Sequence, residues 1–141
     1  QGTAAARGTS LSSQKKALVM TITGTDLGTS ADTPQDHDAF IPAGSYITSA
    51  SLIVTTAFAS GGSATLTIGT YQQDGTTVDA DGIDATVAVA DIGANKAVAC
   101  NGAAVGGTAT VGANDVYIEA IYGTAAFTAG EAKLVIEYIE P

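Results

Sequence analysis

The 25 residues from Val116 to Glu140, VYIEAIYGTAAFTAGEAKLVIEYIE, decide the fold expected for this chain. Two segments within them, 116–122 and 133–140, alternate in polarity and are rich in β-branched and aromatic residues, as β-strands are. On one side of each segment every residue is apolar. We expect these sides to face a core: Val116, Ile118, Ala120 and Tyr122 on the first segment, and Leu134, Ile136 and Tyr138 on the second. Together the two segments predict a C-terminal β-ribbon.

The opposite sides of the two strands also carry large apolar side chains, although charged residues interrupt them. Tyr117 and Ile121 lie on the first strand, and Val135 and Ile139 lie on the second. A sheet face in contact with water alone does not need such residues, and clustered exposed apolar side chains usually mark contact with another chain. We therefore predict that these four residues form an interface with a sister chain or with another protein. Strand propensity alone is the competing explanation, because branched and aromatic residues favour strands even when exposed.

A period of two recurs along most of the remaining chain. Further strands are predicted at 18–23, 40–41, 46–57, 65–68, 96–100 and 108–111. The turn at 60–63 is expected to close a hairpin between the strands at 46–57 and 65–68. The stretch 71–96 is less regular: its spacing of Ile83, Val87 and Ala90 fits a short helix, while Val87 and Val89 also fit a strand.

About eight short strands with connections of this length predict an all-β fold. We expect an antiparallel β-sandwich of jelly-roll type, because eight is the number of strands in a jelly roll.

The charge is distributed unevenly along the chain, which has a net charge of −9. Residues 1–17 contain Arg7, Lys15 and Lys16 and no acidic residue, whereas residues 18–141 contain two lysines and all 14 acidic residues. We expect a flexible basic arm at 1–17, followed by a single sandwich domain at 18–141; a frayed terminus is the alternative for the first segment. The acidic body argues against nucleic acid and anionic membranes as partners, since phosphate contacts need clustered Lys and Arg.

Few residues offer chemistry. The segment Asp79–Asp84, DADGID, resembles part of a calcium loop, but it lacks the spacing and the terminal Glu of an EF-hand, and exposed turns use the same residues. His37 is the only histidine and Cys100 is the only cysteine, and neither lies in a nucleophile-elbow motif. His37, among Asp32, Asp36 and Asp38, is interpreted as a solvated loop residue. The sequence predicts no enzyme, no metal and no cofactor.

One passage resembles a known family. The segments FIPAGSYIT at 40–48, TTAF at 55–58 and GGSATLTIG at 61–69 resemble small structural proteins of tailed bacteriophages. The segment GEAKLVIEY at 130–138 is similar to the end of those chains.

The resemblance implies a capsid decoration, or cement, protein: a β-sandwich that sits on the outer surface of the virion as a homotrimer and stabilises the shell. Its partners would be copies of itself and the major capsid protein, with assembly in the cytoplasm of the bacterial host. Such proteins usually grip the capsid with a terminal arm, and by position and charge that role falls to Arg7, Lys15 and Lys16. The alternative is a receptor- or glycan-binding tip of a phage head or tail fibre, against which the lack of Trp counts.

Overall fold

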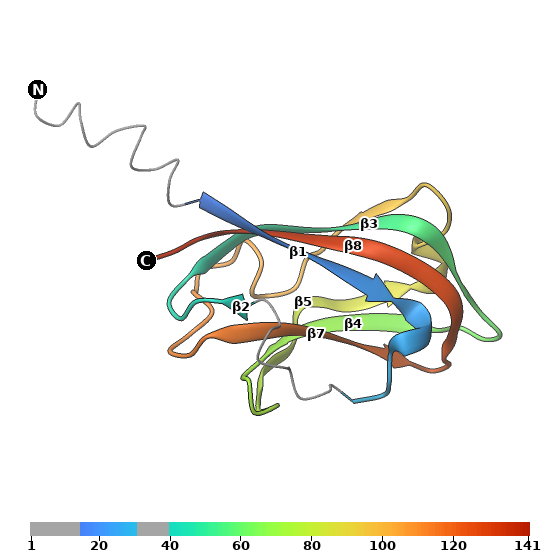
Figure 1. The fold of residues 1–141 in the computed structure, drawn as a ribbon, viewed down its shortest axis with the longest axis horizontal. Coiled ribbons are helices and arrows are strands. Elements are labelled where there is room, and N and C mark those ends of the chain that lie inside the picture. Colours follow the sequence, from blue (N-terminus) through green and yellow to red (C-terminus); the bar gives the residue numbers. More distant parts are fainter. Residues whose placement is uncertain (1–14, 31–39) are drawn as a thin grey trace, which may run out of the picture.

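The computed structural model describes residues 15–30 and 40–141, which form two four-stranded sheets packed face to face (Figure 1). The strands are β1 (Lys15–Thr23), β2 (Phe40–Ile41), β3 (Tyr46–Ser60), β4 (Thr65–Tyr71), β5 (Thr77–Ala88), β6 (Ala97–Ala99), β7 (Val116–Gly123) and β8 (Phe127–Ile139). Two single-turn 3-10 helices, η1 (Gly24–Asp26) and η2 (Val89–Asp91), interrupt the connections. Among the described residues no helix has the length and apolarity needed to span a bilayer.

The strand order confirms the predicted jelly-roll type of sandwich. One sheet has the order β1-β8-β3-β6 and the other has the order β2-β7-β4-β5, with antiparallel pairing throughout. Every pair of strands consecutive in the chain lies in different sheets, except β4 and β5. The chain therefore closes the sandwich by passing back and forth between its two layers.

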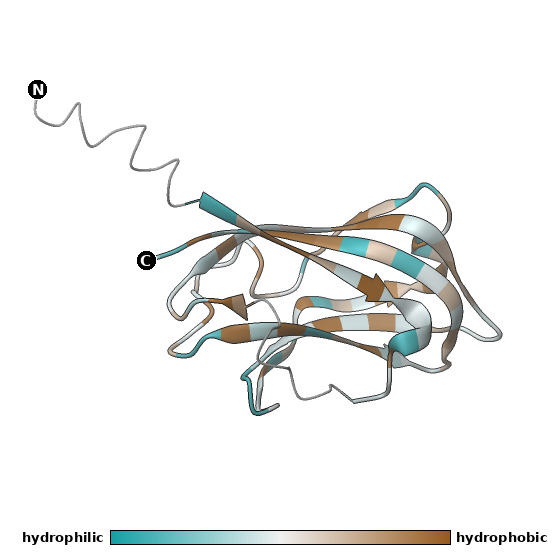
Figure 2. Ribbon diagram, viewed as in Figure 1, coloured by the Kyte–Doolittle hydropathy of each residue, from teal (hydrophilic) through white to brown (hydrophobic). Residues whose placement is uncertain are grey.

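The core lies between the two sheets and follows from the alternation of side chains along each strand. On β8, Ala132, Leu134 and Ile136 are fully buried, and the hydropathy colours alternate along this strand in Figure 2. Leu134 lies between Met20 of β1 and Leu52 of β3 in the strand register. Burial of a Leu or Ile side chain contributes roughly 1.5–3 kcal/mol.

The predicted C-terminal β-ribbon is wrong. β7 and β8 are consecutive, but β7 pairs with β2 and β4, whereas β8 pairs with β1 and β3. The predicted hairpin at 60–63 is wrong for the same reason, because β3 and β4 belong to different sheets. Alternation specifies that a segment is a strand and which side chains share a face, but it does not specify which strand is its neighbour.

Several predicted boundaries also change. The segment 83–88 is strand and not helix, since Ile83 and Val87 both turn into the core from β5. Residues 108–111 form no strand. β1 begins at Lys15, so residues 15–17 belong to the sheet and not to an arm, because they continue the ladder with β8. Residues 1–14 lie outside the described part of the chain.

A bulge in β5 explains Gly69. Thr70 is opposite Asp79 while Ile68 is opposite Asp84, so β5 has extra residues between these two points. The extra residues carry the backbone of Asp79 and Ala80 over Gly69, where a Cβ atom would collide with the Ala80 carbonyl group. Glycine is required here by close backbone approach.

Cys100 is part of the core. Its side chain is buried and its backbone N–H donates to the carbonyl of Ala50 at 2.8 Å. Burial, together with the nearby carboxylate of Asp84, raises the pKa of the Cys100 thiol from 9.0 to about 12.

We predict that Gly69→Ala lowers the free energy of unfolding by about 1–3 kcal/mol, because the added methyl group meets fixed backbone atoms. Gly61→Ala is the matched control, since nothing lies within 4 Å of the position that its methyl group would take, and it should change stability by less than about 1 kcal/mol. Urea unfolding of both variants gives the comparison. Equal stability of the two variants would contradict the bulge geometry.

The raised pKa of the Cys100 thiol predicts that the folded chain loses stability at alkaline pH. The folded state holds the thiol protonated, whereas the unfolded chain ionises it near its ordinary pKa. The contribution of the protonated thiol to the free energy of unfolding is therefore complete below pH 9 and is lost as the pH rises towards 12. The free energy of unfolding of Cys100→Ala, measured from pH 7 to 11, should fall less steeply above pH 9 than that of the unsubstituted chain. Parallel curves would show that Cys100 does not contribute.

Candidate interaction surface

The described residues provide little for catalysis or metal binding. Cys100 is a buried, protonated thiol at neutral pH and is therefore a poor nucleophile. Within residues 15–30 and 40–141, no group of three or more His, Cys, Asp or Glu side chains is placed to hold a metal ion. His37 and the three aspartates around it lie outside the described residues.

The Asp79–Asp84 segment, compared above with a calcium loop, belongs to β5. Asp84 is buried, and its Oδ1 accepts the backbone N–H of Thr86 at 3.1 Å. Burial and a hydrogen bond with Asp81 raise the pKa of Asp79, so these two carboxyl groups are close to each other. The carboxylate of Asp84 is buried and does not join those of Asp79 and Asp81.

The four predicted interface residues do not form one surface. Tyr117 and Ile121 belong to β7, and Val135 and Ile139 belong to β8. The two strands lie in different sheets, and both pairs of residues are on the outer sides, so they point away from each other across the sandwich. The expectation of a single interface containing all four is therefore corrected.

On the β7 side, part of the outer face is covered by the chain itself. Tyr117 is only 7% exposed, and its ring contacts that of Phe40 of β2, with ring centroids 5.7 Å apart. Tyr71 lies opposite Tyr117 in the register of β4 and β7 and is also buried. Tyr117 is thus accounted for by packing within one chain.

On the β8 side, the outer face of the β1-β8-β3-β6 sheet exposes apolar side chains. Val19 is 57% exposed and Ile53 is 46% exposed, while Ile139 is exposed at the end of β8 and Val135 is half-buried. The strand register aligns four uncharged residues across this sheet, which we name the Val19 row: Val19, Val135, Ser51 and Ala99. Exposed apolar side chains gathered in this way are typical of a contact surface.

Val19 and Ile53 do not stand out in the sequence, because each alternates with inward-facing residues as in any half-buried strand. Only the pairing of β1 and β3 with β8 brings them beside Val135.

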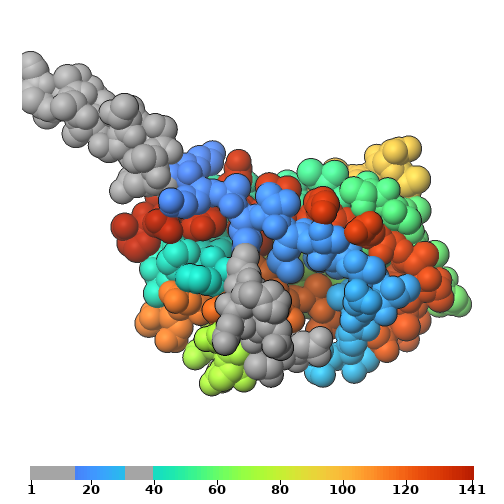
Figure 3. Space-filling view, viewed as in Figure 1, coloured from blue at the N-terminus to red at the C-terminus, as the bar shows by residue number. Residues whose placement is uncertain are grey.

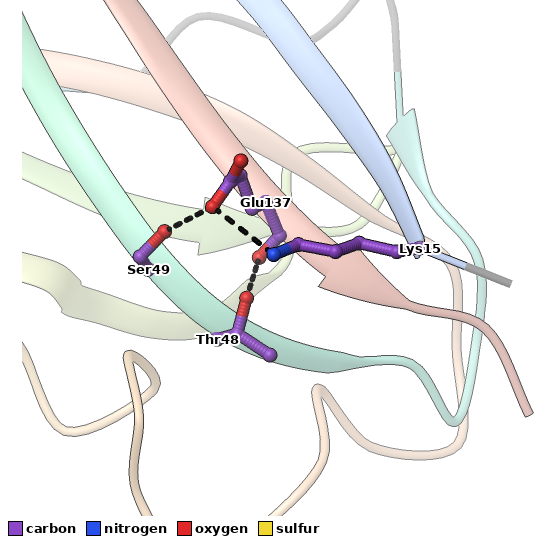
Figure 4. A network of polar contacts seen from close by, with 4 residues as sticks. All are labelled: Lys15, Thr48, Ser49 and Glu137. Carbon is purple, nitrogen blue, oxygen red and sulfur yellow. Dashed lines mark hydrogen bonds and ion pairs between the residues drawn. The ribbon is translucent and has the colours of Figure 1, made fainter. Parts of the chain in front are cut away.

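A polar network at one end of this face joins three strands (Figure 4). The Ser49 hydroxyl donates to Oε1 of Glu137 at 3.0 Å, and Nζ of Lys15 lies 3.7 Å from the same oxygen. The Thr48 hydroxyl donates to the Glu137 carbonyl at 3.1 Å. An exposed ion pair of this kind contributes at most about 1 kcal/mol, so the network aligns the strands more than it stabilises them.

The structure describes two of the three residues predicted to grip a capsid. Lys15 is held against the sheet by Glu137, whereas Lys16 is exposed on β1 and Arg7 lies outside the described residues. Nζ of Lys133 donates to the Thr21 hydroxyl at 2.6 Å on the same outer face. Two lysines and two glutamates (Lys15, Lys133, Glu131 and Glu137) share this face, so its charges balance although the chain is strongly acidic.

No protein-family model matches the chain, and no curated protein matches it by sequence. Solved phage capsids, in contrast, contain chains of the same fold. A chain in the acidic stable capsid structure of Helicobacter pylori bacteriophage KHP30 has a TM-score of 0.60 and 13% identity, and the match covers 90% of this chain and 88% of that one.

Two further capsids give the same result. A chain of the Ralstonia phage GP4 capsid has a TM-score of 0.60 and 16% identity, with 90% of this chain and 84% of that chain covered. A chain of the cyanophage Pam1 capsid asymmetric unit has a TM-score of 0.50 and 19% identity over the same shares. At these identities the likeness establishes the fold: the chain has a jelly-roll type of sandwich that makes up nearly the whole length of chains in phage capsids.

Proposed function

We propose that this chain is a non-enzymatic structural protein of a bacteriophage virion, which decorates the capsid shell and stabilises it as an oligomer. The observation that carries the proposal is the fold match to chains in capsid structures, which extends over 90% of this chain and 84–88% of those chains. Matches of this extent mean that the sandwich alone, without a further large domain, is a component of those assemblies.

Binding is sufficient for such a role. A protein that binds the assembled shell and not its separated subunits stabilises the shell by mass action, by about 2.7 kcal/mol per site when its free concentration is 100 times its Kd. An oligomer adds multivalency, because its second and third contacts form at high effective concentration.

The surfaces available for this role are the arm and the β8 side of the sandwich. Arg7 is the only charged residue of positions 1–14, and Lys16 follows on β1 as an exposed cation. We place Arg7 against an acidic patch of the major capsid protein, on the outer surface of the shell. Val135 and Ile139, with Val19, are the apolar residues offered to a neighbouring chain.

The resemblance described above implies a homotrimer that assembles on capsids in the host cytoplasm. A measurement of the mass in solution tests the number of copies.

The competing function, a receptor- or glycan-binding tip, needs a recognition site. The hollow between β1 and β7 and the hollow beside Thr70 and Asp79 contain no aromatic ring on which a sugar could stack.

Co-sedimentation with undecorated capsids of the cognate phage tests the proposal. The purified chain should pellet with capsids at a fixed ratio, and decorated capsids should resist heating to a higher temperature than bare ones. Failure to bind capsids, combined with adsorption to host cells or to a glycan array, would replace decoration by receptor binding.

We predict that deletion of residues 1–14 abolishes capsid binding and leaves the fold intact, because the ladder of β1 with β8 begins at Lys15. The measurement is the same co-sedimentation assay, with circular dichroism as the check on folding. The single substitution Arg7→Glu, which leaves every strand unchanged, should weaken binding in the same direction. Full binding by both variants would remove the arm from the proposal.

A further inference from the structure

The two sheets have four edge strands, and only β1 presents a long, regular edge. β1 has nine residues and pairs with β8 without any register shift. Within the described residues no backbone hydrogen bond joins β1 to anything other than β8. Its atoms lie on the surface of the molecule in the view of Figure 3. Unpaired N–H and C=O groups on such an edge are a template for another strand.

The other three edges are short or already bonded. β2 has two residues and β6 has three, so neither offers a ladder of useful length. β5 is bulged, and the carbonyls of its residues Gly82 and Ile83 accept the N–H groups of Ala104 and Gly102. Natural sheets protect their edges by these same means, and within residues 15–30 and 40–141 none of them applies to β1.

We propose that β1 pairs with β1 of a second copy of this chain, antiparallel and about a two-fold axis at Val19. Val19 is the central residue of β1 and the most exposed large hydrophobic residue of the described chain. A two-fold axis there places the Val19 side chains of the two copies side by side and joins their Val19 rows into one uncharged row across an eight-stranded sheet. The contact is isologous, so each chain uses the same surface.

The register that this axis imposes is compatible with every side chain of β1. Ala17 lies opposite Thr21 of the second copy, and Lys15 lies opposite Thr23. No two lysines are directly opposite, because the antiparallel arrangement puts the lysines at the two ends of the ribbon. On the inner side, Leu18 lies opposite Met20 and extends the apolar layer.

Charge complementarity supports a second copy as the occupant. A hollow of about 160 Å³ opens between β1 and β7, and its lining includes Ile22, Asp26 and Glu119. In the same register, Lys16 of the second copy lies opposite Ile22 and on the inner side, where it faces this acidic hollow. The arrangement is reciprocal, so each copy places one lysine against the acidic residues of the other.

The pairing does not depend on the proposed capsid function, since it concerns the purified chain alone. It joins two chains, and it does not by itself produce the trimer that the family resemblance implies. A protein that is strictly trimeric in solution would therefore overturn it while leaving decoration of a capsid open.

Cysteine cross-linking of the full 141-residue chain tests the register. Val19→Cys places two thiols opposite each other, where the Cα atoms of paired antiparallel strands, about 4.5–5.5 Å apart, suit a disulfide. Ile53→Cys is the matched control, because it is a similarly exposed residue of the same face, two strands away. After mild oxidation, Val19→Cys should give at least tenfold more covalent dimer than Ile53→Cys. Equal cross-linking would overturn edge pairing, because it would indicate docking through the whole face.

Charge substitutions give an independent readout by sedimentation velocity from 1 µM to 1 mM. Val19→Glu should raise the dimer Kd at least tenfold, because it sets two carboxylates opposite each other, and Lys16→Glu should raise it several-fold. Ile53→Glu and Lys96→Glu, at exposed sites away from the edge, should leave it unchanged. Circular dichroism confirms that all variants fold. A monomer at 1 mM, or a Kd that responds equally to all four changes, would overturn the proposal.

Discussion

The fold depends on the insertion of the last strand between two earlier ones. β8 pairs with the whole length of β1 on one side and with β3 on the other, so the partly buried Met20 meets the buried Leu134 and Leu52 in one row. Until β8 is in place, β1 has no partner in the sheet. Pairings between such distant parts of a chain are slow to form, since the closure entropy is lost before the contacts are gained. The Lys15–Glu137–Ser49 network lies across the same three strands and favours their correct register.

The sequence predicts strands, faces and the number of layers well, because each of these depends on local alternation. Leu134 and Ile136 are buried as the pattern of β8 requires. Strand neighbours cannot be predicted in this way, since β7 and β8 carry the same kind of pattern and lie in different sheets. The acidic segment of β5 has the composition of a loop, because Asp and Gly are typical of turns; Gly69 on the neighbouring strand lets that segment pass as a bulge, which no local signal reveals.

Some residues of the candidate surface can be predicted from a single strand, whereas others can be identified only once the strand pairing is known. Val135 and Ile139 could be recognised as outward-facing from β8 alone, whereas Val19 joins them only through the ladder with β1. Tyr117 looks equally exposed in sequence, but the short strand β2 brings Phe40 over it. An outward-facing aromatic residue is therefore a sign of an interface only when the chain itself provides nothing to cover it.

Charge explains why contacts between copies would concentrate on one side of the molecule. Two chains with a net charge of −9 repel each other over most relative orientations, and they approach at least cost where positive and negative charges balance. The outer face of the β1-β8-β3-β6 sheet is such a place, with two lysines and two glutamates around an uncharged row. Pairing at β1, along one edge of this face, would therefore meet less repulsion than contact through the acidic remainder of the molecule.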